Sequence, residues 1–267
     1  CIRDSPTTPF FHLEGDWYLG NDGARGPWTA DGCHGGPAAA AVARTAELAV
    51  PDKQISRLTL DLFRPVPVSG FRVQAEVGRN GRRVATVALT VLDRSDRACA
   101  TASALFIATS DIGPVLTSAW VPPDRQTACA TEFPLVQRGH GLPTFADAVE
   151  LMVPEPGPFT PGPNTLWKRT PALIEGEVPS AFQAICPLAD CGNSLSRNEE
   201  ATSTTFINPD LSIHMHRAPV SEWIGASFVS RWERSSIGLS TAILFDDEGP
   251  IGTAQQSLLL QRPGPGA

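Results

Sequence analysis

The sequence has no long hydrophobic run and no concentration of basic charge. Its longest apolar stretches, such as Ala38–Ala43, are far shorter than the roughly 20 residues that span a bilayer. The net charge is −7 and the basic residues are scattered, whereas nucleic acid and anionic membranes require a concentrated basic face. The first residues also lack the basic region and apolar core of a signal peptide. We therefore expect a cytoplasmic protein whose partners include neither nucleic acid nor a membrane.

Cysteine is present, but not in the patterns that bind metals or build disulfide scaffolds. None of the six cysteines belongs to a Cys-x-x-Cys pair, and no second cluster completes a zinc site with Cys186 and Cys191. Disulfide scaffolds are short and cysteine-dense, unlike this chain of 267 residues. The sequence therefore predicts reduced thiols.

Several catalytic signatures are also absent. The run Gly192–Ser196 lacks the last glycine of the Gly-x-Ser-x-Gly nucleophile elbow, and no strand precedes it, which disfavours a serine hydrolase of the α/β type. No glycine-rich phosphate loop and no dinucleotide-binding fingerprint occurs. We therefore expect neither nucleotide-driven chemistry nor a cofactor.

What the sequence does contain is a long internal repeat. Three β-rich stretches recur at a constant offset of 153 residues: Leu58–Arg64 with Leu211–Arg217, Val84–Asp93 with Ile237–Asp246, and Ala98–Phe106 with Ile251–Leu259. Solenoid repeats are shorter, roughly 20–50 residues, so this period indicates two copies of one domain.

The first copy is predicted to hold one strand, one helix and four further strands. The first strand covers Phe10–Leu19, and the helix covers Gly35–Ala49, where Pro37 suits the first turn and Pro51 stops the helix. The four later strands are joined by short turns, including Asn80-Gly81, and are therefore antiparallel. They are expected at 56–64, 70–79, 82–93 and 97–108.

The second copy repeats this plan after a segment rich in Pro, Thr and Ala. We predict an N-terminal domain over 1–110, an irregular linker over 111–144 and a C-terminal domain over 145–267. The counterpart helix is expected over 180–196, bent or split at Pro187. Further elements are expected at 146–153, 165–170, 204–217, 223–233, 237–246 and 251–261. The fold class is thus α+β, with two tandem domains that each wrap an antiparallel sheet around a helix.

Three short stretches carry a family resemblance: Leu188-Ala-Asp190, Asp210–Arg217 and Gly252–Gln256. With the duplicated helix and sheet, the chain resembles the double hot-dog architecture and, more narrowly, the type II acyl-CoA thioesterase family. The resemblance implies an enzyme that hydrolyses acyl-CoA. It also implies a site with an aspartate on the second helix, a Thr or Ser beside a strand, and a glutamine on the last strand. These positions match Asp190, Asn208 and Gln256, and Asn208 departs from the family's hydroxyl.

Asp190 stands in an otherwise apolar run. A carboxylate there could orient and deprotonate a water molecule that attacks a thioester carbonyl, or it could simply cap the helix. The repeat favours the catalytic interpretation, because the counterpart of Asp190 is Pro37, which can do no acid–base chemistry.

Gln256 could hold the water or hydrogen-bond the Asp190 carboxylate while remaining neutral. Strand alternation places it on the same face as apolar residues such as Ala254 and Leu258, whereas Gln255 lies on the other face. A slip of one residue would reverse this choice. Asn208 could bond the water or the thioester oxygen, or it could merely begin a strand before Pro209.

Two glycines at the start of the first helix, Gly35 and Gly36, are candidate substrate-binding residues. Their backbone N–H groups could polarise a carbonyl oxygen, or the glycines could be present only for close packing. His34 is expected to be an ordinary loop histidine, although hot-dog dehydratases also place a histidine before a glycine turn. His214 and His216 share a strand face but lack a third ligand, so no metal site is predicted.

Three functions remain open from the sequence. The first is an acyl-CoA thioesterase of lipid metabolism that uses water held by Asp190 and Gln256, with Asn208 assisting. The second is a hydratase or dehydratase that acts on an enoyl or hydroxyacyl thioester through His34. The third is a non-catalytic acyl-CoA-binding protein, which Asn208 favours. Assembly into a homo-oligomer through the sheet edges is compatible with all three.

Overall fold

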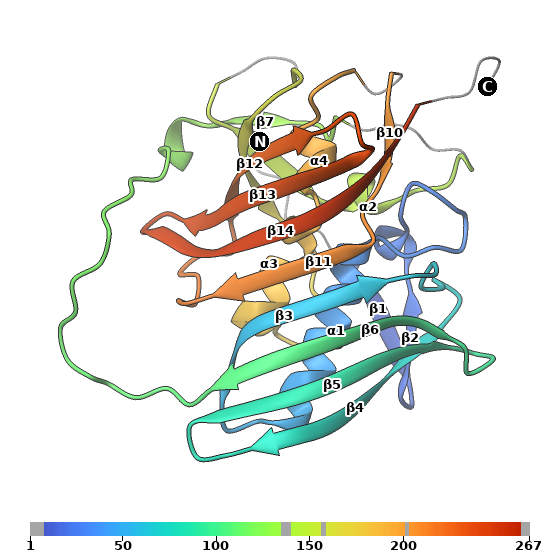
Figure 1. Cartoon of the computed structure of the whole chain (residues 1–267), viewed down its shortest axis with the longest axis vertical. Helices are drawn as coiled ribbons and strands as arrows, with labels where there is room; N and C mark the ends of the chain where they lie inside the picture. The colour runs from blue at the N-terminus through green and yellow to red at the C-terminus, as the bar shows by residue number, and fades with distance from the viewer. Residues whose placement is uncertain (1–7, 135–139, 156–158, 201–202, 263–267) are drawn as a thin grey trace.

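The computed structural model describes residues 8–134, 140–155, 159–200 and 203–262, and one antiparallel sheet of 14 strands runs through them (Figure 1). The strands of the N-terminal half are β1 Phe11–Glu14, β2 Trp17–Gly20, β3 Gln54–Leu62, β4 Phe71–Asn80, β5 Val84–Asp93 and β6 Ala98–Ile107. Those of the C-terminal half are β7 Cys129–Thr131, β8 Glu150–Val153, β9 Asn164–Arg169, β10 Thr205–Ile207, β11 Asp210–Met215, β12 Ile224–Trp232, β13 Ile237–Asp246 and β14 Gly249–Gln261.

The two halves meet where β3 pairs with β11. Thr59 lies opposite Ser212 in this antiparallel pair, and the Ser212 hydroxyl is 3.3 Å from the Thr59 hydroxyl. Because these two residues are separated by the repeat offset, each central strand pairs with its own counterpart. The strand order then runs outward as β3-β6-β5-β4 on one side and β11-β14-β13-β12 on the other. The predicted duplication is therefore the organising feature of the sheet.

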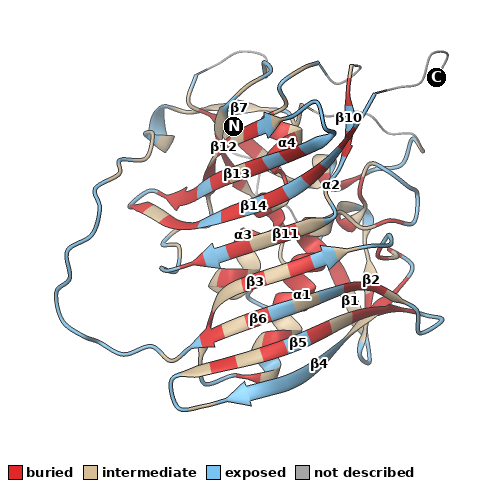
Figure 2. Ribbon diagram, in the orientation of Figure 1, coloured by how far each residue is buried: buried red, intermediate tan, exposed pale blue. Residues whose placement is uncertain are grey.

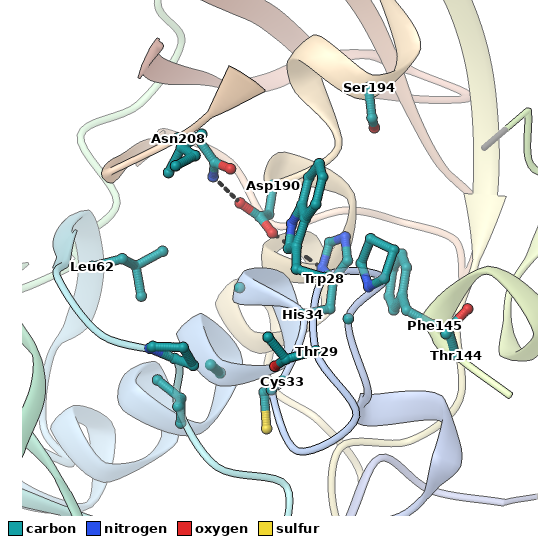
Figure 3. Close-up of a pocket in the computed structure, with 18 of the residues that line it drawn as sticks. Trp28, Thr29, Cys33, His34, Leu62, Thr144, Phe145, Asp190, Ser194 and Asn208 are labelled. Carbon is teal, nitrogen blue, oxygen red and sulfur yellow. Dashed lines mark hydrogen bonds and ion pairs between the residues drawn. The ribbon is translucent and has the colours of Figure 1, made fainter. Parts of the chain in front are cut away.

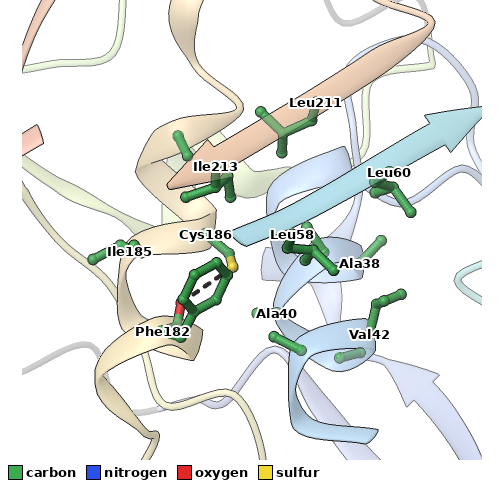
Figure 4. Close-up of a cluster of buried hydrophobic side chains, with 14 of the residues drawn as sticks. Ala38, Ala40, Val42, Leu58, Leu60, Phe182, Ile185, Cys186, Leu211 and Ile213 are labelled. Carbon is green, nitrogen blue, oxygen red and sulfur yellow. Dashed lines mark hydrogen bonds between the residues drawn. The ribbon is translucent and has the colours of Figure 1, made fainter. Parts of the chain in front are cut away.

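The two long helices, α1 Gly35–Ala49 and α3 Ala181–Ala189, pack against each other on one face of this sheet (Figures 1 and 4). All alanines of α1 except Ala49 at its end are buried, and a Cβ atom added at Gly36 would lie 2.7 Å from Cα of Pro187. The small side chains thus allow the two backbones to approach closely. The start of α1 lies beside the end of α3, which brings Gly35 next to Asp190.

Two shorter helices, α2 Phe145–Ala148 and α4 Gly192–Leu195, and two 3₁₀ turns, η1 Asp22–Ala24 and η2 Arg125–Thr127, complete the described elements. Burial alternates along the central strands, so their inner side chains and the helices form the core while the outer face carries exposed residues (Figure 2). No described helix has the length and apolarity needed to cross a membrane. Each of the cysteines that the structure describes has a free thiol, and Cys1 lies outside that part of the chain.

Several of the predicted elements differ in the structure. The single strand expected over Phe10–Leu19 is the β1–β2 hairpin, which turns at Gly15 with a φ of +63°. The strand expected over 204–217 is interrupted at Asn208-Pro209, where Pro209 has no N–H to donate. The expected helix 180–196 does split, but at Asp190-Cys191 rather than at Pro187. Pro187 remains inside α3 because the turn beyond it closes through the Asp190 N–H, which donates to the Cys186 carbonyl.

The segment 111–144 is not irregular throughout. It contains η2 and β7, and β7 pairs with β8 at the edge of the sheet of the C-terminal half. The element expected over 146–153 begins as α2 and continues as β8. The domain boundaries at 110 and 145 remain a prediction.

Candidate active site

A cavity of about 470 Å³ lies where the beginning of α1 meets the end of α3 (Figure 3). Its volume is in the range of small-molecule sites. Both halves of the chain contribute to its largely apolar wall, which includes Trp28, Leu62, Phe63, Val66, Phe133, Phe145, Phe206 and Ile207. Three polar side chains on this wall could take part in acid–base chemistry or hydrogen-bond a substrate: Asp190, Asn208 and His34.

Asp190 ends α3 and points its carboxyl group toward the cavity, with only 5% of its side chain exposed. Its Oδ1 atom accepts a hydrogen bond from Asn208 Nδ2 at 2.9 Å and another from Gln256 Nε2 at 2.8 Å. The structure therefore brings together the three residues that the sequence analysis singled out. Two amide donors on one oxygen favour the ionised carboxylate.

His34 contacts the other carboxyl oxygen of Asp190. Its Nδ1 atom is 3.1 Å from Oδ2 and also accepts a hydrogen bond from the backbone N–H of Gly36, so His34 is the N-cap of α1. The imidazole stacks on Phe145 with ring centroids 4.0 Å apart. The expectation of an ordinary loop histidine is therefore wrong, because close helix packing carries His34 into the site.

Burial controls the protonation of this pair. Desolvation raises the pKa of Asp190 to about 7, against the opposing effects of Asn208, Lys168, the backbone N–H of Gly36 and Gln256. Desolvation and, to a smaller extent, the positive charge of Lys168 together lower the pKa of His34 to about 3. Near neutral pH the imidazole is thus uncharged and Asp190 is close to half protonated. Such a carboxyl group can both take up and release a proton during a reaction.

The two glycines differ in what their backbone N–H groups do. The N–H of Gly36 is directed at His34 and is not free, and its lack of a side chain accommodates Pro187. Gly35 lines the cavity, and its N–H donates no hydrogen bond within the described residues. The close-packing interpretation thus accounts for Gly36, while Gly35 keeps a donor at the positive end of α1.

The strand register separates Gln256 from Gln255. Gln256 is 2% exposed and faces Asp190, whereas Gln255 points away from the core and is exposed. His214 and His216 are both exposed and lie away from the cavity. Within the described residues, no group of three or more His, Cys, Asp or Glu is arranged to hold a metal.

Sequence reasoning missed Lys168, which lies beneath the site with 1% of its surface exposed. Its Nζ atom donates to the Pro187 carbonyl at 2.6 Å and to Cys191 Sγ at 3.2 Å. One signal was available, because Lys168 directly follows the apolar pair Leu166-Trp167 within a predicted strand. A charged residue at that place indicates a buried polar group.

Comparisons with known proteins agree with this architecture. The profile of the acyl-CoA thioesterase N-terminal domain matches residues 24–107, and that of the acyl-CoA thioesterase C-terminal domain matches residues 116–260. Among curated proteins, none matches this chain.

Solved structures of similar fold cover nearly the whole chain. A putative thioesterase II from Thermobifida fusca has a TM-score of 0.73 at 16% identity, covering 96% of this chain and 99% of its own. A putative thioesterase from Novosphingobium aromaticivorans has a TM-score of 0.71 at 19% identity, covering 96% and 100%. The tesB protein of Mycobacterium avium subspecies paratuberculosis has a TM-score of 0.68 at 14% identity, covering 94% and 95%.

At these identities the structural likeness shows the hot-dog fold, and the two domain profiles show the family. The C-terminal profile alone spans more than half of the chain, and the two profiles follow one another as the duplication requires. The chain therefore belongs to the acyl-CoA thioesterase family and is a thioester hydrolase.

Proposed function

We propose that this enzyme hydrolyses an acyl-CoA thioester by direct attack of a water molecule that Asp190 deprotonates. The observation that carries this proposal is the Asp190 carboxyl group, with a pKa near 7, on the wall of an apolar cavity. A base with a pKa near the working pH is the most effective at accepting a proton from water. The apolar wall suits an acyl chain.

In this mechanism Asn208 and Gln256 fix the carboxylate through Oδ1. The ionised carboxylate takes one proton from water as the water oxygen bonds to the thioester carbon. The tetrahedral intermediate then breaks its carbon–sulfur bond, and the coenzyme A sulfur leaves with the proton that Asp190 returns. The products are a free acid and a free thiol, without a covalent enzyme intermediate.

The N–H of Gly35 is the proposed donor to the developing oxyanion. It lies at the start of α1, where the helix dipole adds positive potential, and Gly35 lines the cavity. His34 contributes through Asp190. Nδ1 accepts from the Gly36 N–H and so carries no proton, which makes the 3.1 Å contact a hydrogen bond that the protonated carboxyl group of Asp190 donates. When Asp190 is ionised, the Gly36 N–H also stabilises its carboxylate.

The decisive experiment measures free thiol released from short, medium and long acyl-CoA substrates by the parent protein and by Asp190→Asn. We expect turnover in the parent and a loss of about 100-fold or more in the variant, the contribution of a general base. Glu47→Gln is a matched control, because Glu47 is a partly buried carboxylate held by Ser180 and Gln183 at the opposite ends of α1 and α3. Equal turnover in the parent and Asp190→Asn would contradict the proposal.

A hydratase or dehydratase remains the second candidate, and the His34–Asp190 contact favours it, since that chemistry needs a histidine beside a carboxyl group. Loss of activity in a His34 variant cannot separate the two candidates, because His34 touches the proposed base of the hydrolase. Product identity does. Addition of water to an enoyl thioester removes its conjugated absorbance and releases no thiol, whereas hydrolysis releases thiol. Binding without either product would indicate the non-catalytic protein.

A further inference from the structure

Lys168 is a buried amine that, as an ammonium group, uses all three of its donor positions; burial lowers its pKa, whereas Cys191 and Asp190 oppose that effect. Its Nζ atom donates to the Pro187 carbonyl at 2.6 Å and to Cys191 Sγ at 3.2 Å, and it lies 4.2 Å from the centre of the Phe145 ring. An ammonium group has three N–H donors and no acceptor. A carbonyl oxygen, a sulfur atom and the negative face of an aromatic ring are the surroundings that such a group requires.

Lys168 also makes no ion pair with any carboxylate that the structure describes, so this burial needs another explanation. Burying a charge without an opposite charge in contact costs several kcal/mol. The chain has only two lysines, and the other, Lys53, pairs with Asp52 and Asn80 near the opposite end of α1. Because burying Lys168 beneath the cavity costs stability and no ion pair offsets that cost, we infer that the residue has a function there.

The contacts of Lys168 converge on the candidate base. Pro187 and Cys191 stand on either side of Asp190 in the turn that ends α3, and the Phe145 ring stacks on His34. One ammonium group therefore touches the backbone turn that carries Asp190 and the ring that supports its histidine partner. Lys168 is not among the residues that line the cavity, so it has no direct contact with a substrate there.

We propose that Lys168 is a positioning residue that fixes the turn carrying Asp190 and supplies the buried positive charge that keeps this carboxyl group able to ionise. This inference rests on the proposed role of Asp190 as the base. The titratable groups that face the ammonium are Asp190 and Cys191 at the end of α3 and His34 at the start of α1. Lys168 lowers the pKa of Asp190 against the rise that burial causes, and it lowers the pKa of His34, which keeps the imidazole neutral.

The first test compares the pH dependence of thiol release in the parent, Lys168→Met and the control Lys53→Met. Methionine keeps the unbranched shape and removes the charge. We expect the acid limb of kcat in Lys168→Met to move upward by about one pH unit, the effect of removing a nearby opposite charge. At pH 7 this shift lowers kcat about fivefold and leaves KM within about twofold of the parent value, since Lys168 does not line the cavity.

Lys168→Arg retains the charge and should keep the acid limb of the parent if it folds, as judged by circular dichroism. The inference would be overturned if the acid limb of the kcat–pH profile of Lys168→Met stays at the parent position. It would also be overturned if the variant differs from the parent only in KM. A purely structural role would lower activity equally at all pH values and leave the limb unmoved.

A second measurement needs neither turnover nor a Lys168 variant. With only two lysines, the protein labelled with [ζ-¹⁵N]lysine gives two side-chain signals, and Lys53→Met assigns them. We expect the Lys168 signal to remain that of an ammonium group from pH 6 to 9 and to shift near pH 7 as Asp190 titrates, with no such shift in Asp190→Asn. A neutral amine at pH 7, or a signal that is indifferent to Asp190, would refute the inference even if the thioesterase proposal stands. If the enzyme releases no thiol, this titration still decides the role of Lys168.

Discussion

His34 Nδ1 lies 3.1 Å from Asp190 Oδ2, so the N-cap of one long helix touches the residue that ends the other. This contact joins the two copies of the duplicated domain at one end of their helix pair. At the opposite end, Glu47 is bonded to Ser180 and Gln183, and none of these lines the cavity. Duplication has therefore produced a symmetric sheet with an asymmetric chemistry, in which one copy supplies the carboxyl group and the other supplies the histidine.

The pH dependence of kcat/KM should reflect the ionisation of Asp190. Because the pKa of this carboxyl group is raised to about 7 by burial, the active ionised form accumulates as the pH rises through 7. We expect kcat/KM to increase about tenfold per pH unit below pH 6 and to level off above pH 8. Thiol release measured from pH 5 to 9 checks this expectation. An acid limb near pH 4, the ordinary range of an aspartate, would contradict the assignment.

Neighbouring glutamines provide a matched pair of variants. Gln256→Ala removes the 2.8 Å hydrogen bond to Asp190 Oδ1, and a hydrogen bond to a charged group contributes about 1.5–3 kcal/mol. We therefore expect kcat to fall at least about tenfold. Gln255→Ala changes an exposed side chain on the opposite face of β14 and should leave kcat unaltered. Equal losses in the two variants would show that the strand, and not the hydrogen bond, is what activity requires.

The repeat offset made most of the long strands predictable, because a strand recognised in one copy marks its counterpart in the other, whereas the pairing of β3 with β11 was not predicted. The offset that sets Val84–Asp93 on Ile237–Asp246 reproduces the observed bounds of β5 and β13. The break of the second helix was misplaced because Pro187 suggests a break where it stands. The helix continues past Pro187 because the Asp190 N–H beyond the proline still bonds to the Cys186 carbonyl, and the presence of a proline in the sequence does not reveal whether that turn closes.

The candidate site was only partly predictable for a related reason. Asp190 and Gln256 were singled out by the family resemblance, and the repeat supported Asp190 because its counterpart, Pro37, can do no acid–base chemistry. His34 and Lys168 reach the site through the packing of α1 on α3 and of β9 beneath them, which no spacing in the sequence encodes. Asn208 came from a family resemblance, and its bond to Asp190 could not be derived from its neighbours in the chain.

Gly36 should be intolerant of any side chain, although alanine is the better helix former. A Cβ atom at this position would lie 2.7 Å from Pro187 Cα and 2.9 Å from the Pro187 carbonyl, both of which are backbone atoms that cannot rotate away. We expect Gly36→Ala to lower the free energy of unfolding by about 2 kcal/mol or more, as overpacking does, despite a gain in helix propensity of about 1 kcal/mol. Urea denaturation measures the change. Gly81→Ala is the control, since its nearest contact would be an ordinary 3.4 Å.

The His34–Asp190 pair should contribute little to the pH dependence of stability as long as both residues are present. Between about pH 4 and 6 the unfolded chain holds one proton on this pair, on the histidine, because the ordinary pKa values are 6.5 and 3.8. The folded protein also holds one proton, on Asp190, because burial raises the pKa of Asp190 to about 7 and lowers that of His34 to about 3. Because the folded and unfolded states bind the same number of protons on this pair, the pair does not make the free energy of unfolding depend on pH in this range.

Single variants should uncover two opposite slopes. In Asp190→Asn only the lowered pKa of His34 remains, so its contribution to stability is present above pH 6.5 and is lost as the pH falls toward 3. In His34→Asn only the raised pKa of Asp190 remains, so its contribution is present below pH 3.8 and is lost as the pH rises through 7. Relative to the parent, the free energy of unfolding should fall with acid in the first variant and rise in the second. In each variant the free energy of unfolding, relative to the parent, should change by up to about 1.4 kcal/mol per pH unit. Urea denaturation at several pH values from 4 to 7 measures both slopes, and slopes of the same sign would show that the two groups do not share one proton.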